Sequence, residues 1–185
     1  MHKSSVMQGI FIKPDQFYPM WLSGLLLALL LMLVTPFTQA SGFSITDTSG
    51  KTHTLAGYKG KWVLVNFWAT WCPYCRKEKP VIDEFWTDYR ARGFEVIAIS
   101  IDDSPAQIAA WARETGYAFM AAPTNTSVGA AFGGISSVPT SFILDRDGHI
   151  RHKIAGQLHY ARLKALVEPL LPKNASPHPQ ADRHP

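Results

Sequence analysis

The chain has 185 residues, of which 46% are hydrophobic and 17% charged, and its formal net charge is +4 at pH 7. This composition permits a packed core and argues against wholesale disorder. The basic residues are spread along the sequence without a Lys/Arg run, so we expect no nucleic-acid partner. Only two cysteines are present, which excludes a small domain held together by several disulfides.

The first forty residues are typical of an export leader. Residues 20–34 form an uncharged apolar stretch without the polar face of a globular helix, and small residues follow it up to Ser41. Residues 1–40 are therefore predicted to be a signal peptide, cleaved after Ala40, or a membrane anchor formed by residues 20–37. In either case we expect a periplasmic or other extracytoplasmic location, with membrane contact only through this segment.

Residues 41–171 carry alternating strand and helix patterns and are predicted to form one α/β domain. In chain order we predict a hairpin over 43–55, a strand at 62–68, a helix at 73–91, a strand at 94–101, a helix from 105 to Gly116, a short strand at 118–122, a strand at 140–144 with its hairpin partner at 149–154, and a helix at 160–171. This order gives a mixed sheet with helices on both faces. Residues 172–185 lack periodicity and are predicted to be a disordered tail.

The two cysteines lie where a buried strand meets a helix, in the segment Trp71-Cys72-Pro73-Tyr74-Cys75. Cys72 falls at the helix N-cap, where free N–H groups and the helix dipole stabilise a thiolate. Cys75 follows one turn later on the same face and can resolve a mixed disulfide formed by Cys72. A structural disulfide and half of a zinc site are the alternatives. A zinc site needs about four ligands, and without a second cysteine pair we expect no metal and no cofactor.

A second candidate element is Val138-Pro139-Thr140, just before a predicted strand. A proline that simply starts a strand is the plain explanation. The functional alternative is a cis-proline loop packed against the cysteine pair, whose backbone groups can pair with an extended substrate chain. The redox motif upstream favours the second interpretation.

Residues 63–80, with the Val-Pro-Thr loop and the Asp145–Gly148 turn, resemble the thioredoxin superfamily, and within it the TlpA/ResA/CcmG (DsbE) branch of exported thiol–disulfide oxidoreductases. The resemblance covers residues 43–171. It implies a thioredoxin fold, a central mixed β-sheet flanked by helices, with an N-terminal β-hairpin extension. It also implies reduction of protein disulfides outside the cytosol, often for cytochrome c maturation, with a membrane thiol–disulfide electron donor. The substrate-binding candidates are Trp71, Pro73, Tyr74, Val138, Pro139 and Thr140.

Two positions bear on proton transfer. Thioredoxin has a buried Asp where this chain has Asn66, and an amide cannot act as a base. Glu78 matches the acidic residue that follows the cysteine motif in the ResA-like branch, and it lies three residues after Cys75 on the same helical face. If it is buried, its pKa should rise and it could take the Cys75 proton, so Glu78 joins Cys72 and Cys75 as a candidate catalytic residue. An ordinary exposed glutamate is the alternative.

The leading hypothesis is therefore an exported, monomeric protein-disulfide reductase. A disulfide-donating oxidase or isomerase is the second, because Pro73-Tyr74 departs from the dipeptides of thioredoxin and ResA and resembles that of glutaredoxins. A binding chaperone that carries copper or apo-cytochrome through the same thiols is the third. The two-residue spacing of the cysteines argues against copper, because copper carriers of this fold generally use a three-residue spacing.

Overall fold

A run of β-branched and aromatic residues, Trp62–Trp68, forms the central strand of the sheet. The computed structural model describes residues 42–102 and 104–173. The strands are β1 (Ser44–Thr46), β2 (Thr52–Thr54), β3 (Trp62–Trp68), β4 (Phe94–Ser100), β5 (Met120–Pro123), β6 (Thr140–Leu144) and β7 (Ile150–Ala155); the helices are α2 (Pro73–Tyr89), α3 (Pro105–Thr115), α4 (Thr126–Ala131) and α5 (Tyr160–Val167), with 3₁₀ turns η1 (Leu55–Tyr58), η2 (Arg90–Arg92) and η3 (Glu168–Leu170).

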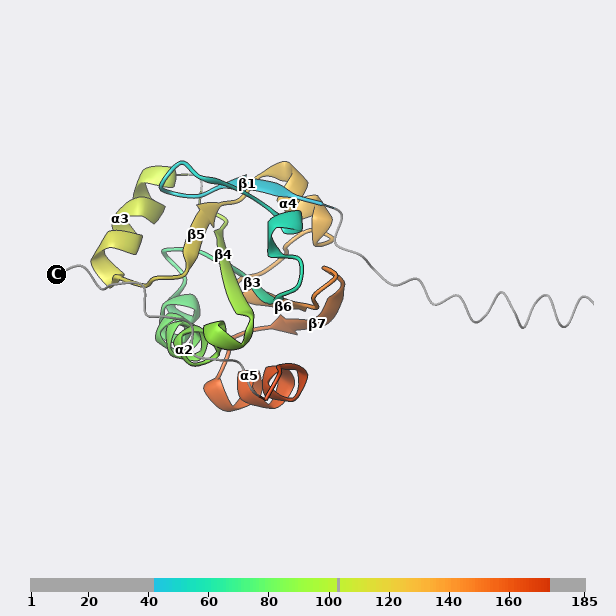
Figure 1. The fold of residues 1–185 in the computed structure, drawn as a ribbon. Helices are drawn as coiled ribbons and strands as arrows, with labels where there is room; N and C mark the ends of the chain where they lie inside the picture. The colour runs from blue at the N-terminus through green and yellow to red at the C-terminus, as the bar shows by residue number, and fades with distance from the viewer. Residues whose placement is uncertain (1–41, 103, 174–185) are drawn as a thin grey trace, which may run out of the picture. The chain divides into compact units, whose positions relative to one another are not determined.

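The main sheet has the order β5-β4-β3-β6-β7 (Figure 1). The β3–β4 and β4–β5 pairs are parallel, whereas β6 and β7 run antiparallel to their neighbours. The predicted mixed sheet is thus confirmed, and β1 and β2 form the predicted N-terminal hairpin as a separate two-stranded sheet. Strand β3 is hydrogen-bonded on both sides, to β4 and to β6. The segment after it, which carries the cysteines, therefore starts from a strand that is fixed on both edges.

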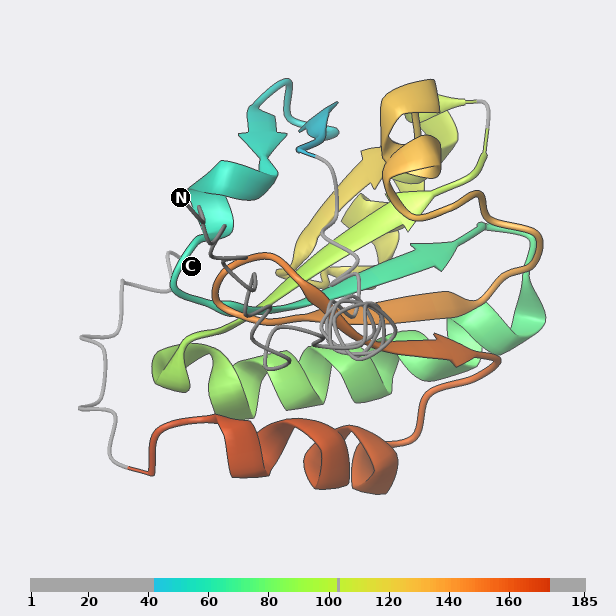
Figure 2. The ribbon, with the colours of Figure 1, turned by 90° about the vertical axis from the view of Figure 1, so that its right-hand side faces the viewer.

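Both faces of the sheet are covered, and the alternation along β3 decides which side chain meets which layer. Leu64 and Trp68 pack in the core cluster shared with α2, α3 and α5, whereas Val65 and Phe67 pack in the cluster shared with α4 and the hairpin. Figure 2 shows α2 and α5 side by side on one face and the hairpin on the other. Asn66 therefore faces α2 from the middle of the strand.

The helix boundaries follow local signals. The Ser104 hydroxyl accepts a hydrogen bond from the Gln107 amide at the start of α3, and Gly116 ends that helix with a positive φ of 67°. Helix α2 continues through Pro80, and the chain leaves η2 at Gly93, where φ is 85°. These stops agree with the prediction to within a few residues.

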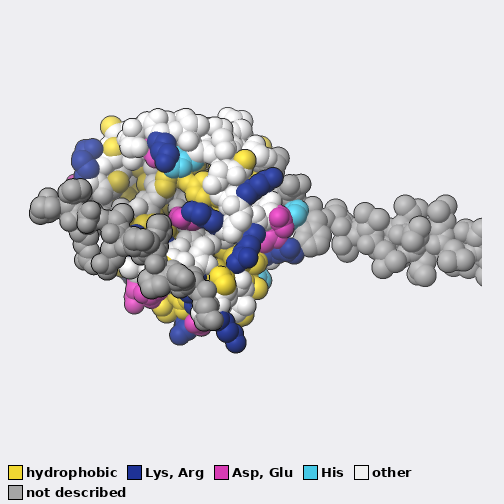
Figure 3. Space-filling view, viewed as in Figure 1, with side chains coloured by type: hydrophobic (Ala, Val, Ile, Leu, Met, Phe, Trp, Pro, Cys, Tyr) yellow, Lys and Arg dark blue, Asp and Glu magenta, His cyan; other side chains and the backbone are white. Residues whose placement is uncertain are grey.

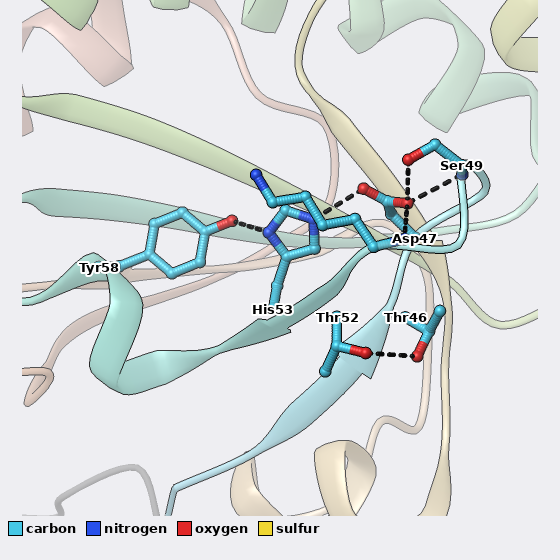
Figure 4. A network of polar contacts seen from close by, with 7 residues as sticks. Thr46, Asp47, Ser49, Thr52, His53 and Tyr58 are labelled. Carbon is cyan, nitrogen blue, oxygen red and sulfur yellow. Dashed lines mark hydrogen bonds and ion pairs between the residues drawn. The ribbon is translucent and has the colours of Figure 1, made fainter.

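The hairpin is fastened to η1 by a polar network centred on His53 (Figure 4). The imidazole Nε2 lies 2.7 Å from Asp47 Oδ2, and Nδ1 lies 2.9 Å from the Tyr58 hydroxyl. Asp47 Oδ1 also accepts from the amides of Ser49 and Lys51. Burial opposes ionisation of Asp47, but these hydrogen bonds outweigh it and lower its pKa to about 2. The ionised Asp47 side chain thus forms an Asx turn that fixes the turn between β1 and β2.

Two elements differ most from the sequence prediction, and one helix was not predicted. The short strand lies at Met120–Pro123 and not at 118–122, because pairing with Ile97 sets its register. The last helix ends at Val167 and passes into η3, where Pro169 has no N–H to continue the α-helix. Helix α4 was not predicted, since its six residues carry no apolar period; the Asn125 side chain caps it through the Val128 amide.

The predicted leader, residues 1–40, and residues 174–185 of the predicted tail lie outside the described residues. In the part of the chain that is described, no helix combines the length and apolar character that crossing a bilayer requires. On the face seen in Figure 3, Lys and Arg side chains lie apart from one another, with acidic and neutral surface between them. The described residues left visible on that face form no concentrated basic patch.

Candidate active site

The turn between β3 and α2 is anchored by the loop that follows β4. The Ile101 amide donates to the Trp68 carbonyl at 2.9 Å, and the Thr70 amide donates to Asp102 Oδ2 at 2.7 Å. Asp102 also accepts from the Ser100 hydroxyl at 2.6 Å. These bonds fix the backbone before the first cysteine, so the start of α2 is held by two strands rather than one.

Cys72 and Cys75 form a disulfide with a Cα–Cα distance of 5.2 Å. Cys72 is the N-cap of α2, and its Sγ accepts a hydrogen bond from the Cys75 amide at 3.2 Å. Pro73 takes the first helical position, where its missing N–H costs nothing. Both cysteines are buried, with Cys75 the deeper at 0% exposed against 3% for Cys72. A sulfur at this N-terminus meets a free amide and the positive end of the helix dipole, both of which stabilise a thiolate.

The Val138–Pro139 peptide bond is cis, and its loop lies against the cysteine pair. The Val138 carbonyl oxygen is 3.9 Å from Cys72 Sγ. The Pro139 carbonyl accepts from the Gly156 amide at 2.9 Å, which ties the loop to the end of β7. Thr140 is buried, and its hydroxyl donates to the Ser137 carbonyl at 2.8 Å, so its side chain braces the loop.

Two large aromatic side chains flank the cysteines on the surface. Trp71 is 66% exposed and Tyr74 is 60% exposed, whereas Trp68 is fully buried. Among the described residues, the exposed large hydrophobic side chains are these two and Leu170. Leu170 lies beside Trp62, which is at the far end of β3 from Cys72. The apolar surface is thus concentrated around the disulfide.

Glu78 is completely buried one turn after Cys75. Its Oε1 accepts from the Asn66 amide nitrogen at 2.8 Å, and its Oε2 accepts from the Leu158 backbone amide at 2.7 Å. Burial raises the pKa of Glu78, and these hydrogen bonds and the charge of Lys79 only partly offset the effect. The prediction of a buried glutamate on this helical face is confirmed. Each carboxylate oxygen keeps a second lone pair for a further proton donor.

Two further residues complete this buried group. Lys79 Nζ donates to Asn66 Oδ1 at 2.5 Å, and Asn66 Nδ2 donates to Ser141 Oγ at 2.9 Å. All three residues are fully buried. The sequence analysis did not single out Lys79 or Ser141, because a lysine in a charged helical segment is ordinarily on the surface. A buried asparagine in a strand facing that helix is the one signal that pointed to polar partners there.

Asp145, Asp147 and His149 are near enough to one another to hold a metal ion. However, Asp145 Oδ1 accepts from the amides of Asp147 and His149, and Oδ2 accepts from Arg151 Nε at 2.6 Å. Burial opposes the charge on Asp145, but these hydrogen bonds lower its pKa. They assign the cluster to the β6–β7 turn, far along the sheet from the cysteines.

Comparisons with known proteins agree with this geometry. Residues 37–153 match the AhpC/TSA family. The thiol–disulfide oxidoreductase ResA of Bacillus thuringiensis is 32% identical over 134 residues, which cover 72% of this chain and 78% of the relative. ResA of Bacillus subtilis is 27% identical over 140 residues, covering 75% of this chain and 78% of the relative.

Solved structures give the same fold. A thiol:disulfide interchange protein of the thioredoxin family from Chlorobium tepidum superposes with a TM-score of 0.67 at 30% identity, over 72% of this chain and 96% of that chain. StoA of Bacillus subtilis, at 20% identity and a TM-score of 0.60, covers 68% of this chain and 96% of its own, and shares the fold. The thioredoxin fold with an N-terminal hairpin is thereby confirmed.

Proposed function

Because this chain belongs to the AhpC/TSA family and is a thiol–disulfide oxidoreductase related to ResA, we propose that it reduces protein disulfides outside the cytosol. The observation that carries the proposal is the Cys72–Cys75 disulfide at the N-terminus of α2, with the Val138 carbonyl beside Cys72 Sγ. A dithiol in this position has a stabilised thiolate next to backbone that an extended chain can approach.

In the first step, the Cys72 thiolate attacks one sulfur of a substrate disulfide. A bond forms between Cys72 Sγ and that sulfur, and the second substrate sulfur leaves as a thiolate. Cys72 is the attacking residue because it is the N-cap, where the Cys75 amide donates to its sulfur, and because it is the more exposed of the pair. Trp71 and Tyr74 bind the chain that flanks the target disulfide.

In the second step, Cys75 resolves the mixed disulfide. Its thiol gives a proton to the Glu78 carboxylate, and the resulting thiolate attacks Cys72 Sγ. The bond between Cys72 and the substrate breaks, and the substrate sulfur leaves with the electron pair. Two electrons have then passed to the substrate, and the enzyme holds the Cys72–Cys75 disulfide seen in the structure. Glu78 is the proton acceptor because it is buried one turn after Cys75 and because the facing residue on β3, Asn66, is an amide and cannot act as a base.

Turnover requires a reductant for this disulfide. We propose a membrane protein with a dithiol, which is oxidised as Cys72 and Cys75 are reduced. The apolar stretch at 20–34 supports export and placement at that membrane, as a leader or an anchor. Because the chain resembles the ResA branch, we propose apo-cytochrome c as its substrate. We also propose that the enzyme acts as a monomer.

The reduction potential of the Cys72–Cys75 pair tests the direction of electron flow. We expect a value near that of thioredoxin, about −270 mV, or lower, measured by equilibration with dithiothreitol or glutathione buffers. Pro73-Tyr74 between the cysteines is the observation that favours the second candidate, a disulfide donor. A potential near about −120 mV would replace the reductase with that donor.

The exposed aromatic pair gives a second prediction. Trp71→Ala and Tyr74→Ala should each raise KM for a peptide disulfide about threefold to tenfold, because each removes an aromatic contact. Reaction with a small aliphatic disulfide should change little. Leu170→Ala is the matched control, since Leu170 is the other exposed large apolar side chain of the described residues. Equal effects on peptide and small disulfides would contradict a role in binding the chain.

A further inference from the structure

Lys79 is a completely buried lysine that the proposed mechanism does not use. Lysine is almost never buried fully unless it is paired. Its Nζ lies 4.5 Å from the centroid of the Trp68 ring and 5.6 Å from that of Phe119, so aromatic faces enclose the ammonium. The ammonium group of Lys79 donates a hydrogen bond to Asn66 Oδ1. The side chain is therefore aimed at the strand residue that also contacts Glu78.

Asn66 joins the lysine to the glutamate through the two ends of one amide. Its oxygen accepts from Lys79 Nζ, and its nitrogen donates to Glu78 Oε1. An ammonium can only donate and a carboxylate can only accept, so these partners permit one orientation of the amide. Without the lysine donor, the buried amide oxygen would lose this hydrogen-bond partner. Lys79 thus supports the Glu78 contact from the other end of the amide, beside the bond that Asn66 Nδ2 donates to Ser141 Oγ.

The charged groups around Glu78 can be followed element by element. On α2, Lys79 is its immediate neighbour; from the segment before α5, His159 also acts on its charge. Asn66 on β3 and Ser141 on β6 are neutral, and the enclosing rings of Trp68 and Phe119 carry no charge. Lys79 is therefore the buried cation that shares this interior with Glu78. An ammonium so near a carboxylate in a poorly hydrated site favours the ionised acid.

We propose that Lys79 is a positioning residue for Glu78: through Asn66 it orients the carboxylate, and its charge keeps that carboxylate ionised to accept the Cys75 proton. This inference rests on the proposed function. The proton balance is that of the second step, in which Cys75 loses one proton and Glu78 gains it. Lys79 donates hydrogen bonds throughout and touches no reacting atom. Burial lowers the pKa of Lys79 to about 7, against the opposing charge of Glu78, so the ammonium is about half populated near pH 7 and predominates below it.

The test follows the resolving step by itself. Reduced enzyme is mixed with an equimolar aromatic disulfide that releases a coloured thiolate. One release reports attack by Cys72, and a second, equal release reports resolution by Cys75. Lys79→Met should move the midpoint of the pH profile of the second release upward by about one pH unit and leave the first release nearly unchanged. Lys59→Met, which removes one exposed positive charge elsewhere, is the control.

A second pair of variants separates positioning from simple packing. In a Glu78→Gln background, which should lack the acidic limb, Lys79→Met should leave the rate and the pH dependence of the second release unchanged, because the lysine acts through the glutamate. Lys79→Gln keeps a hydrogen-bond donor for Asn66 but removes the charge. It should shift the pH profile of the second release in the same direction as Lys79→Met, by a smaller amount. This variant replaces Lys79→Met in the test if the methionine variant does not fold.

The inference would be overturned by a folded Lys79→Met variant whose profile keeps the wild-type midpoint. It would equally be overturned if Lys79→Met still altered the rate or pH dependence of the second release when Glu78 is glutamine. A wild-type enzyme that releases a single thiolate would instead refute the proposed resolving step, so the two failures are distinguishable.

Discussion

Cys75→Ser should convert the enzyme into a covalent trap, whereas Cys72→Ser should be inert. Without Cys75 the mixed disulfide between Cys72 and the substrate has no internal nucleophile to break it, so it should accumulate in a one-to-one adduct. Without Cys72 the thiolate that begins the reaction is missing, and disulfide turnover should fall by about three orders of magnitude or more. Mass spectrometry of both variants after incubation with a peptide disulfide, without reductant, measures the adducts directly.

The same pair of variants separates the enzyme from a thiol-based binding chaperone. A chaperone that holds copper or apo-cytochrome without exchange would form no disulfide adduct with Cys75→Ser. Circular dichroism of the two serine variants is the control for folding, because the structure shows both cysteines in the core. Trapping by Cys72→Ser and not by Cys75→Ser would reverse the assigned roles and contradict the mechanism.

Glu78→Gln should slow the resolving step about a hundredfold at neutral pH, within the range that a positioned general base contributes. The wild-type rate should fall as pH drops through the pKa of Glu78, since protonation removes the acceptor. That pKa lies above its ordinary value of 4.5 because the carboxyl group is buried. The glutamine variant should lose this acidic limb, while the attack by Cys72 keeps its own pH dependence.

Glutamine is nearly isosteric with glutamate, so it can still accept the Leu158 amide and fill the same space. Glu84→Gln, an exposed position on α2, is the matched control and should leave the profile unchanged. The measurement is the release of the second thiolate from the aromatic disulfide across the pH range. A Glu78→Gln enzyme with the wild-type acidic limb would assign that limb to another group.

The sequence alone was sufficient for the strands and helices with a strong period. Strand β3 and helix α2 carry long apolar patterns and clear end signals, and the Cys-x-x-Cys motif marks the junction between them. Helix α4 could not be predicted, because six residues with one buried valine and one buried alanine give too short a signal. The β5 boundary could not be predicted either, since pairing with β4 sets it and local composition does not.

The same distinction applies to the site. The cysteines follow from a local motif, the cis-proline loop from that motif and the fold it indicates, and the candidacy of Glu78 from helical phase together with the family resemblance. The contacts of Lys79 do not, because they join α2 to Asn66 on β3, which in turn bonds Ser141 on β6. A charged segment next to Pro80 gives no sign that one lysine points inward. Burial of that kind is a property of the packed tertiary structure, and it appears only when the three elements are assembled.

The edges of the main sheet carry a consequence for the proposed reduction of disulfides in partly unfolded chains. Such chains offer strands that can add to any free edge and aggregate with it. Here the Thr48 amide of the hairpin donates to the Ala121 carbonyl of β5, which occupies one acceptor on that edge. The other edge, β7, exposes Arg151 and Lys153, charges that disfavour strand addition. For the polypeptide substrate proposed above, we therefore expect contact at the Val138 backbone rather than addition to the sheet, which would let the substrate leave once its sulfur is released.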